Sequence, residues 1–271
     1  MYLKYRPEID GLRALAVLSV IVYHAGFILD GKQLFEGGFI GVDIFFVISG
    51  YLITLIILRE IQSGAFSFSG FYERRARRIL PVLFVVMLCS TPLAWIYMLP
   101  EALKEYSASI LSSLVFGSNF LFWQEDSYTA EPSALKPFLH TWSLSIEEQF
   151  YVVLPALLIV LFRYAKNSTA ALIGLLICVS LAVAECSSHF FPESAFYLLP
   201  ARAWELLAGS LIAKFEFDKG RPVNLSVGKI MPSLGLILIV GSLFLFDKST
   251  RHPSLLLGRC SSFGFLVGVN G

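Results

Sequence analysis

Charged residues are scarce in this chain: they make up 15% of its 271 residues, against about 25% in an average soluble domain. The net charge of +1 excludes a global field that would recruit nucleic acid. The four cysteines are scattered without a CxxC pair, so neither a disulfide framework nor a zinc site is expected. Hydrophobic residues instead reach 56%, with 24 phenylalanines, which indicates a membrane protein.

Several apolar stretches have the length of a membrane-crossing helix, roughly 20 residues. We predict an all-α fold, a polytopic transmembrane helix bundle of about seven full spans with a re-entrant segment and a partial last span. The serine-rich stretch Tyr106–Trp123 is expected to enter and leave on the outer side, and Pro253–Val267 is the partial span. The full spans are Ile9–Leu29, Phe39–Leu58, Ile79–Leu99, Ser143–Phe162, Thr169–Cys186, Ala195–Phe215 and Gly228–Phe246.

The N-terminus has some features of a secretion signal, because Lys4 and Arg6 precede an apolar run. Glu8 and Asp10 stand beside them, however, and no small-residue cleavage site follows, so we expect a retained first span. Lysine and arginine concentrate in three connections, which the positive-inside rule places in the cytoplasm together with the N-terminus. These connections are Arg59–Arg78, Arg163–Lys166 and Lys214–Lys229.

Arg13 and His24 lie eleven residues apart in the first span. At 100° per residue they return to within about 20° of one face, with a rise of roughly 16 Å. One stripe of this helix therefore carries a cation near the cytoplasmic end and an imidazole near the outer end. Taken singly, Arg13 also fits an interfacial snorkelling residue, and His24 a packed, hydrogen-bonded histidine.

Further ionisable residues enter the membrane from the outer side. Asp43 lies at about the depth of His24, while His140, Glu147 and Glu148 head a later span. A histidine oriented by a carboxylate is the arrangement that general-base catalysis requires. Because adjacent residues diverge on a helix, one glutamate is expected to face the interior and the other to accept from a neighbouring arginine or serine. A purely structural polar network is the alternative.

A run of arginines and a charged pair complete the candidate site. The run Arg74–Arg78 has guanidinium groups that suit phosphate oxygens, although such a run also satisfies the positive-inside rule and binds anionic lipid headgroups. Arg202 and Glu205, three residues apart within a span, are expected to form an ion pair that either serves function or locks the bundle.

Five motifs occur in an order that is similar to one known family: Tyr5–Ala14, Gly38–Ile53, Phe71–Pro81, His140–Tyr151 and Ala201–Gly209. On these motifs the sequence resembles the acyltransferase-3 family of integral membrane acyltransferases, which includes bacterial O-antigen and exopolysaccharide O-acetylases.

The resemblance implies an acyltransferase of the bacterial inner membrane. It would move an acyl group, usually acetyl, from cytoplasmic acyl-CoA to a hydroxyl of an extracytoplasmic or lipid-linked glycan, such as lipopolysaccharide O-antigen or exopolysaccharide. Direct transfer and an acyl-histidine intermediate are both compatible with the sequence, and no metal is expected. The family's essential arginine and histidine match Arg13 and His24. The family's donor-binding motif matches the run Arg74–Arg78. From this match and the polar residues identified above, we predict His24, Asp43, His140, Glu147 and Glu148 for catalysis, and Arg13, Arg74, Arg75, Arg77 and Arg78 for the donor.

The C-terminus departs from the family pattern. We expect residues 1–250 to form an incomplete acyltransferase-3-like membrane domain and residues 251–271 an atypical, truncated tail, because Arg259 interrupts the last apolar stretch. Two other interpretations stay open: a flippase-like carrier of a lipid-linked sugar, since buried ionisable residues and broken helices serve transport too, and an inactive truncated relative.

Overall fold

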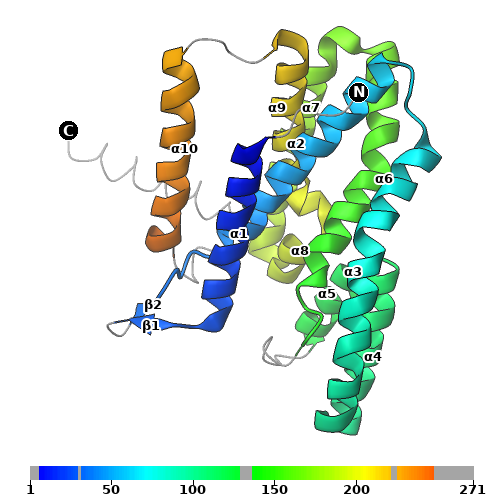
Figure 1. The fold of residues 1–271 in the computed structure, drawn as a ribbon, viewed down its shortest axis with the longest axis vertical. Coiled ribbons are helices and arrows are strands. Elements are labelled where there is room, and N and C mark those ends of the chain that lie inside the picture. The colour runs from blue at the N-terminus through cyan, green and yellow to red at the C-terminus, as the bar shows by residue number, and fades with distance from the viewer. Residues whose placement is uncertain (1–5, 30–31, 129–135, 221–224, 247–271) are drawn as a thin grey trace.

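The computed structural model describes residues 6–29, 32–128, 136–220 and 225–246 (Figure 1). Over these residues the predicted all-α class is confirmed, apart from a short antiparallel β pair between the first two helices. The elements are α1 (Pro7–Ala25), β1 (Ile28–Leu29), β2 (Lys32–Gln33), α2 (Ile40–Gln62), α3 (Phe68–Tyr97), α4 (Pro100–Leu114), α5 (Ser118–Tyr128), α6 (Thr141–Tyr164), η2 (Lys166–Ser168), α7 (Thr169–Phe190), α8 (Pro192–Tyr197), α9 (Leu199–Lys219) and α10 (Leu225–Leu245).

Several helices are long and apolar enough to cross a membrane, and the chain is a multi-pass membrane protein. In the described part of the chain, four segments meet this criterion by length and composition: α2, α3, α6 and Lys166–Phe190, which contains α7. α1, α9 and α10 occupy the other predicted spans, but α1 and α9 carry several ionisable side chains. The count of seven spans stays a prediction, and the partial span at Pro253–Val267 lies outside the described residues.

The predicted re-entrant stretch is not one continuous helix. α4 ends at Leu114, Phe116 adopts a left-handed conformation (φ 53°), and α5 begins at Ser118. At this turn the amide of Gln149 in α6 donates to the Phe116 carbonyl oxygen (3.0 Å), which satisfies a backbone group that the helix break leaves free. Which face of the membrane each end of this stretch meets stays a prediction.

The centre of the bundle is the crossing of α2 and α9. Gly50 of α2 faces the backbone of Leu206, and Gly209 of α9 faces the backbone of Val47, so closely that neither position has room for a Cβ. Small residues at such crossings let two backbones approach and gain dispersion contacts in a membrane. Next to them, Thr54 donates a hydrogen bond to Ser210 across the same interface (2.8 Å).

The bundle has a basic end and an opposite end. The α2–α3 connection, the α6–α7 connection and the C-terminal end of α9 lie at the upper end in Figure 1, and these are the three predicted basic connections. The β1–β2 pair, α8 and the start of α6 lie further down the bundle. The three basic connections therefore lie at one end of the bundle.

Candidate functional site

Two histidines from distant parts of the sequence meet away from the basic end. His24 lies in the last turn of α1, and His140 immediately precedes α6. Their imidazole ring centroids are 4.5 Å apart and the ring planes meet at 85°, an edge-to-face contact. The structure thus brings together two of the residues that the sequence predicts for the site.

The orientation of His24 is set by its own helix. Its Nδ1 lies 2.9 Å from the carbonyl oxygen of Val20, one turn earlier. A carbonyl oxygen only accepts hydrogen bonds, so Nδ1 carries the proton and the neutral ring presents Nε2 as its basic atom. We expected a carboxylate to orient His24, but this backbone carbonyl holds the ring instead.

Arg13 lies on the same flank of α1 as His24. α2 packs on α1 where Gly41 meets the backbone of Ala16. At 100° per residue, Arg13 and His24 project roughly 60° and 80° from Ala16 in the same rotational sense, so both lie on one side of the α2 contact. Within the described residues, the ion pair of Arg13 is a long one (3.7 Å) to the half-exposed Asp10. The Arg13 guanidinium is therefore only loosely held.

The Asp43 carboxylate binds an arginine, and not the imidazole of His24. Nη1 of Arg202 lies 3.0 Å from Asp43 Oδ1 and 2.9 Å from Glu205 Oε1, and the Arg202 and Glu205 side chains are buried. The predicted Arg202–Glu205 ion pair is confirmed, and Asp43 joins it from α2. A guanidinium buried in a bundle must be neutralised, and this demand takes the Asp43 carboxylate away from His24.

The two adjacent glutamates bind different neighbours. Glu147 accepts hydrogen bonds from Ser49 of α2 (2.9 Å) and from Tyr151 (3.2 Å). Glu148 accepts two from Arg75 of α3, the shorter at 2.8 Å. The expected divergence is present, but both carboxylates accept hydrogen bonds between helices, and neither contacts an imidazole of the described residues.

Arg78 differs from the other three arginines of the basic run. Within the part of the chain that the structure describes, it makes no hydrogen bond or ion pair, and its side chain is exposed. Its neighbours are neutralised by carboxylates and are less available to a phosphate. These pairs are Arg74 with Glu60 (2.8 Å), Arg75 with Glu148 (2.8 Å) and Arg77 with Glu73 (2.7 Å).

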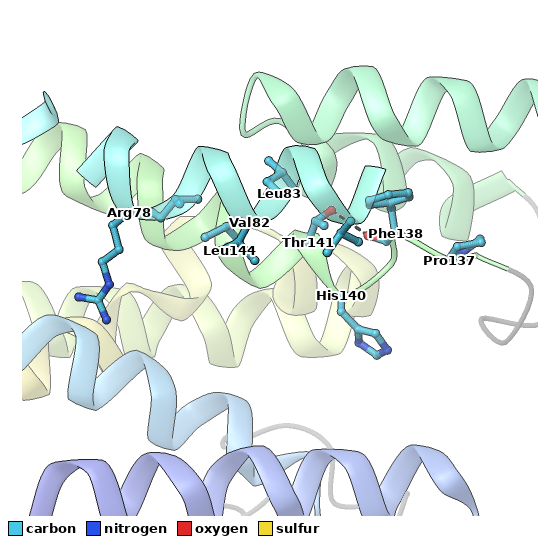
Figure 2. Close-up of a pocket in the computed structure, with 10 residues that line it drawn as sticks. Arg78, Val82, Leu83, Pro137, Phe138, His140, Thr141 and Leu144 are labelled. Atoms are coloured by element: carbon cyan, nitrogen blue, oxygen red, sulfur yellow. Dashed lines mark hydrogen bonds between the residues drawn. The ribbon is translucent and has the colours of Figure 1, made fainter. Parts of the chain in front are cut away.

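A groove of about 490 Å³ runs between α3 and the start of α6 (Figure 2). Arg78 lies at one end and His140 lies toward the other, and Figure 2 shows both side chains projecting to the same side, toward the ribbons of α1 and α2. Between them the walls are mostly apolar. The other lining residues are Ile79, Val82, Leu83, Val86, Pro137, Phe138, Thr141 and Leu144.

Some residues that shape the site cannot be identified from the sequence alone. Trp142 stands in a motif singled out above, but its contact with the Arg202 guanidinium, 5.7 Å from the ring centroid, depends on tertiary packing. Ser49 and Val20 carry no sequence signal, since a serine and a backbone carbonyl occur everywhere. In the described residues no three His, Cys, Asp or Glu side chains gather as a metal site would require. The absence of a metal stays a prediction.

The contact between the imidazoles makes protonation of the pair unfavourable. Partial burial, and secondly the positive charge of a protonated His24, lower the pKa of His140. We expect an NMR titration of labelled histidine in nanodiscs to give His140 a midpoint below the ordinary histidine value of about 6.5. The neutral form is favoured in the folded state, so stability is lost as the pH falls below that value.

In His24→Ala the midpoint of His140 should rise only part of the way, because burial is the larger cause and remains. A midpoint above the ordinary value, or one that His24→Ala leaves unchanged, would contradict the contact.

Comparison with known proteins identifies the family. The family described as "Acyltransferase domain" matches residues 6–271. The chain belongs to this family. It is the acyltransferase-3 family that the five motifs indicated, so the resemblance is confirmed. The predicted division at residue 250 stays a prediction, and residues 247–271 lie outside the described structure.

Several curated proteins are similar to this chain in sequence. Peptidoglycan O-acetyltransferase OatA of Listeria monocytogenes is 38% identical over 228 residues, which are 81% of this chain and 36% of OatA. YrhL of Bacillus subtilis, provisionally named a peptidoglycan O-acetyltransferase, is 39% identical over 218 residues, which are 78% of this chain and 33% of YrhL. The chain thus spans about a third of the length of these relatives. No solved structure matches it.

Proposed function

We propose that this chain is a membrane O-acetyltransferase, which moves an acetyl group from acyl-CoA to a hydroxyl of a cell-envelope glycan. The observation that carries the proposal is one groove lined by two different groups: Arg78, whose guanidinium is unpaired among the described residues, and His140, whose ring contacts His24. Family membership and the names of the relatives support the same class of reaction.

The donor is proposed to be acetyl-CoA, with its phosphates near Arg78 and its thioester near the imidazoles. An unpaired guanidinium suits phosphate oxygens, and the loosely held Arg13 lies on the flank of α1 that also carries His24. Apolar walls suit a slender uncharged arm, and α3 rises roughly 12 Å from Arg78 to Val86. Arg74, Arg75 and Arg77 would add positive potential without direct contact.

His24 is proposed as the general base. Its Nε2 takes the proton of the acceptor hydroxyl while the hydroxyl oxygen attacks the thioester carbon. A C–O bond forms, the C–S bond breaks, and the leaving thiolate takes the proton from the imidazolium. His140 would lie edge-on against the His24 ring and help to hold its position. An acyl-histidine at His24 is the two-step version of the same transfer.

The acceptor is proposed to be a glycan outside the plasma membrane. The relatives' names favour peptidoglycan over a lipopolysaccharide O-antigen. The basic end of the bundle supports a cytoplasmic N-terminus in a bacterial plasma membrane, where acetyl-CoA is available at that end. Mass spectrometry of cell-wall fragments from cells with and without the gene would separate these acceptors.

Arg78→Gln tests the donor site. Loss of a charge-assisted contact should raise the KM for acetyl-CoA by about tenfold to 100-fold and leave kcat within a small factor. The measurement is transfer of radiolabelled acetyl from acetyl-CoA to soluble peptidoglycan fragments by the protein in proteoliposomes.

Arg163→Gln is the matched control, because it removes an arginine near the C-terminal end of α6 that packs on Tyr164 and does not line the groove. An unchanged KM in Arg78→Gln, or the same change in both variants, would remove Arg78 from the donor site. Movement of labelled glycan without CoA would instead indicate a carrier.

A further inference from the structure

The Asp43–Arg202–Glu205 cluster takes no part in the chemical steps of the proposed acetyl transfer. Its guanidinium contacts three other helices. Arg202 of α9 binds Asp43 of α2, donates to the Phe196 carbonyl oxygen of α8 (3.3 Å) and lies against the Trp142 ring of α6 (5.7 Å from the centroid). One side chain of α9 therefore connects α2, α8 and α6, the helix that begins next to His140.

The charges of the cluster do not cancel as they stand. Two carboxylates surround one guanidinium, and among the described residues Asp43 and Arg202 are the charged groups that act on Glu205. Glu205 is fully buried, and its Oε2 has no hydrogen-bond partner within the described structure, whereas the Asp43 side chain is 30% exposed. A buried net charge without a partner is strongly unfavourable, and one proton on Glu205 removes it.

The cluster is also linked to both imidazoles. Trp142 is two residues from His140, and its ring packs on Phe196 with centroids 4.6 Å apart. Asp43 is two residues from Gly41, where α2 packs against α1, the helix whose last turn carries His24. Movement of the guanidinium would therefore shift the surroundings of each histidine separately.

We propose that Arg202, held by Asp43 and by a protonated Glu205, is a positioning residue that sets His140 against His24. This inference rests on the proposed function for its kinetic consequences, but its structural part stands without it. The guanidinium keeps its flat face on Trp142 and its donors on the two carboxyl groups. A lysine offers the charge without this geometry.

The kinetic test is Arg202→Lys. A displacement of about 1 Å at the imidazoles should lower kcat by about 100-fold. The KM for acetyl-CoA should stay within twofold of wild type, roughly, because Arg78 marks the opposite end of the groove. Arg163→Gln again serves as the control. Unchanged kcat, or a rise in KM as large as the fall in kcat, would overturn the positioning role.

The structural test needs no activity. His24→Cys and His140→Cys, in a chain whose native cysteines are replaced by serine, should be joined by a short bifunctional thiol reagent in nanodiscs. Adding Arg202→Lys should lower the cross-linking yield several-fold, while adding Glu205→Gln should leave it unchanged, because a neutral amide replaces a neutral acid. Equal yields with and without Arg202→Lys, or a loss with Glu205→Gln, would overturn the proposal.

The proton itself has a spectroscopic signature. Infrared spectra of the wild type at neutral pH should contain a protonated-carboxyl C=O band that Glu205→Gln removes. Absence of that band from the wild type would show that Glu205 is ionised. If the wild type transfers no acetyl group while the cross-linking and the infrared band behave as expected, the proposed function is wrong. The structural role of Arg202 in setting His140 against His24 would still hold.

Discussion

His24→Ala is expected to abolish all but a trace of acetyl transfer, with a fall in kcat of about 10²–10⁴-fold, the contribution of a positioned acid–base group. Nε2 of His24 is the basic atom that the structure presents, because Nδ1 is held by the Val20 carbonyl oxygen. His140 cannot replace it fully, since it lacks that orienting contact in the described structure and precedes a different helix. The KM for acetyl-CoA should change little. The measurement is single-turnover and steady-state transfer from radiolabelled acetyl-CoA in proteoliposomes.

The matched control is His189→Ala. His189 is exposed near the end of α7, pairs with Glu185 (3.2 Å) and lies in no contact with the His24–His140 pair. It should transfer acetyl at the wild-type rate. Trapping of labelled protein in the wild type but not in His24→Ala would favour the acyl-histidine route. Wild-type kcat in His24→Ala would end the assignment of His24 as the base.

Gly209→Ala is expected to prevent the chain from folding into a stable bundle. A Cβ at this position would overlap the carbonyl oxygen of Val47 and lie 2.7 Å from the backbone nitrogen of Tyr51. Both obstacles are backbone atoms of α2, so relief requires α2 and α9 to separate. We expect the free energy of unfolding to fall by more than about 3 kcal/mol, at the upper end of overpacking effects. Gly50→Ala should behave in the same way, because its Cβ would overlap the Leu206 carbonyl oxygen.

Gly174→Ala in α7 is the control for this prediction. Nothing lies within 4 Å of a Cβ at position 174, and alanine in a helix interior is more stable than glycine by about 0.5–1 kcal/mol. The measurements are the yield of monodisperse protein in detergent and its thermal unfolding midpoint. A midpoint of Gly209→Ala equal to that of the wild type would show that the α2–α9 crossing is looser than the structure describes.

The helices were predictable because their causes are local. A run of apolar residues such as Ile40–Gln62 must satisfy its backbone internally in lipid, whatever its neighbours are. The Arg202–Glu205 pair was predictable for the same reason, since residues three apart on one helix are adjacent. The shared flank of Arg13 and His24 likewise follows from helix geometry alone.

The partners of the ionisable residues were not predictable in this way. Asp43 lies at the expected depth, but its carboxylate binds an arginine 159 positions later in the sequence. The basic run gave no sign that Arg75 binds Glu148 while Arg78 lines a groove, because both depend on how α3 packs against α6. Contacts across helices depend on rotation about each helix axis, which composition does not determine.

The sequence by itself determined that the protein lies in a lipid membrane, where its helices run and which family it belongs to. It also determined how far apart a cation and an imidazole lie along the first helix. All of these follow from hydrophobicity, hydrogen bonding within a helix and the spacing of residues. Only the tertiary structure decided which carboxylates neutralise which arginines, which arginine remains open to a ligand and which histidine meets His24. Each buried charge must find a counter-charge in three dimensions, and helix packing decides which one lies within reach.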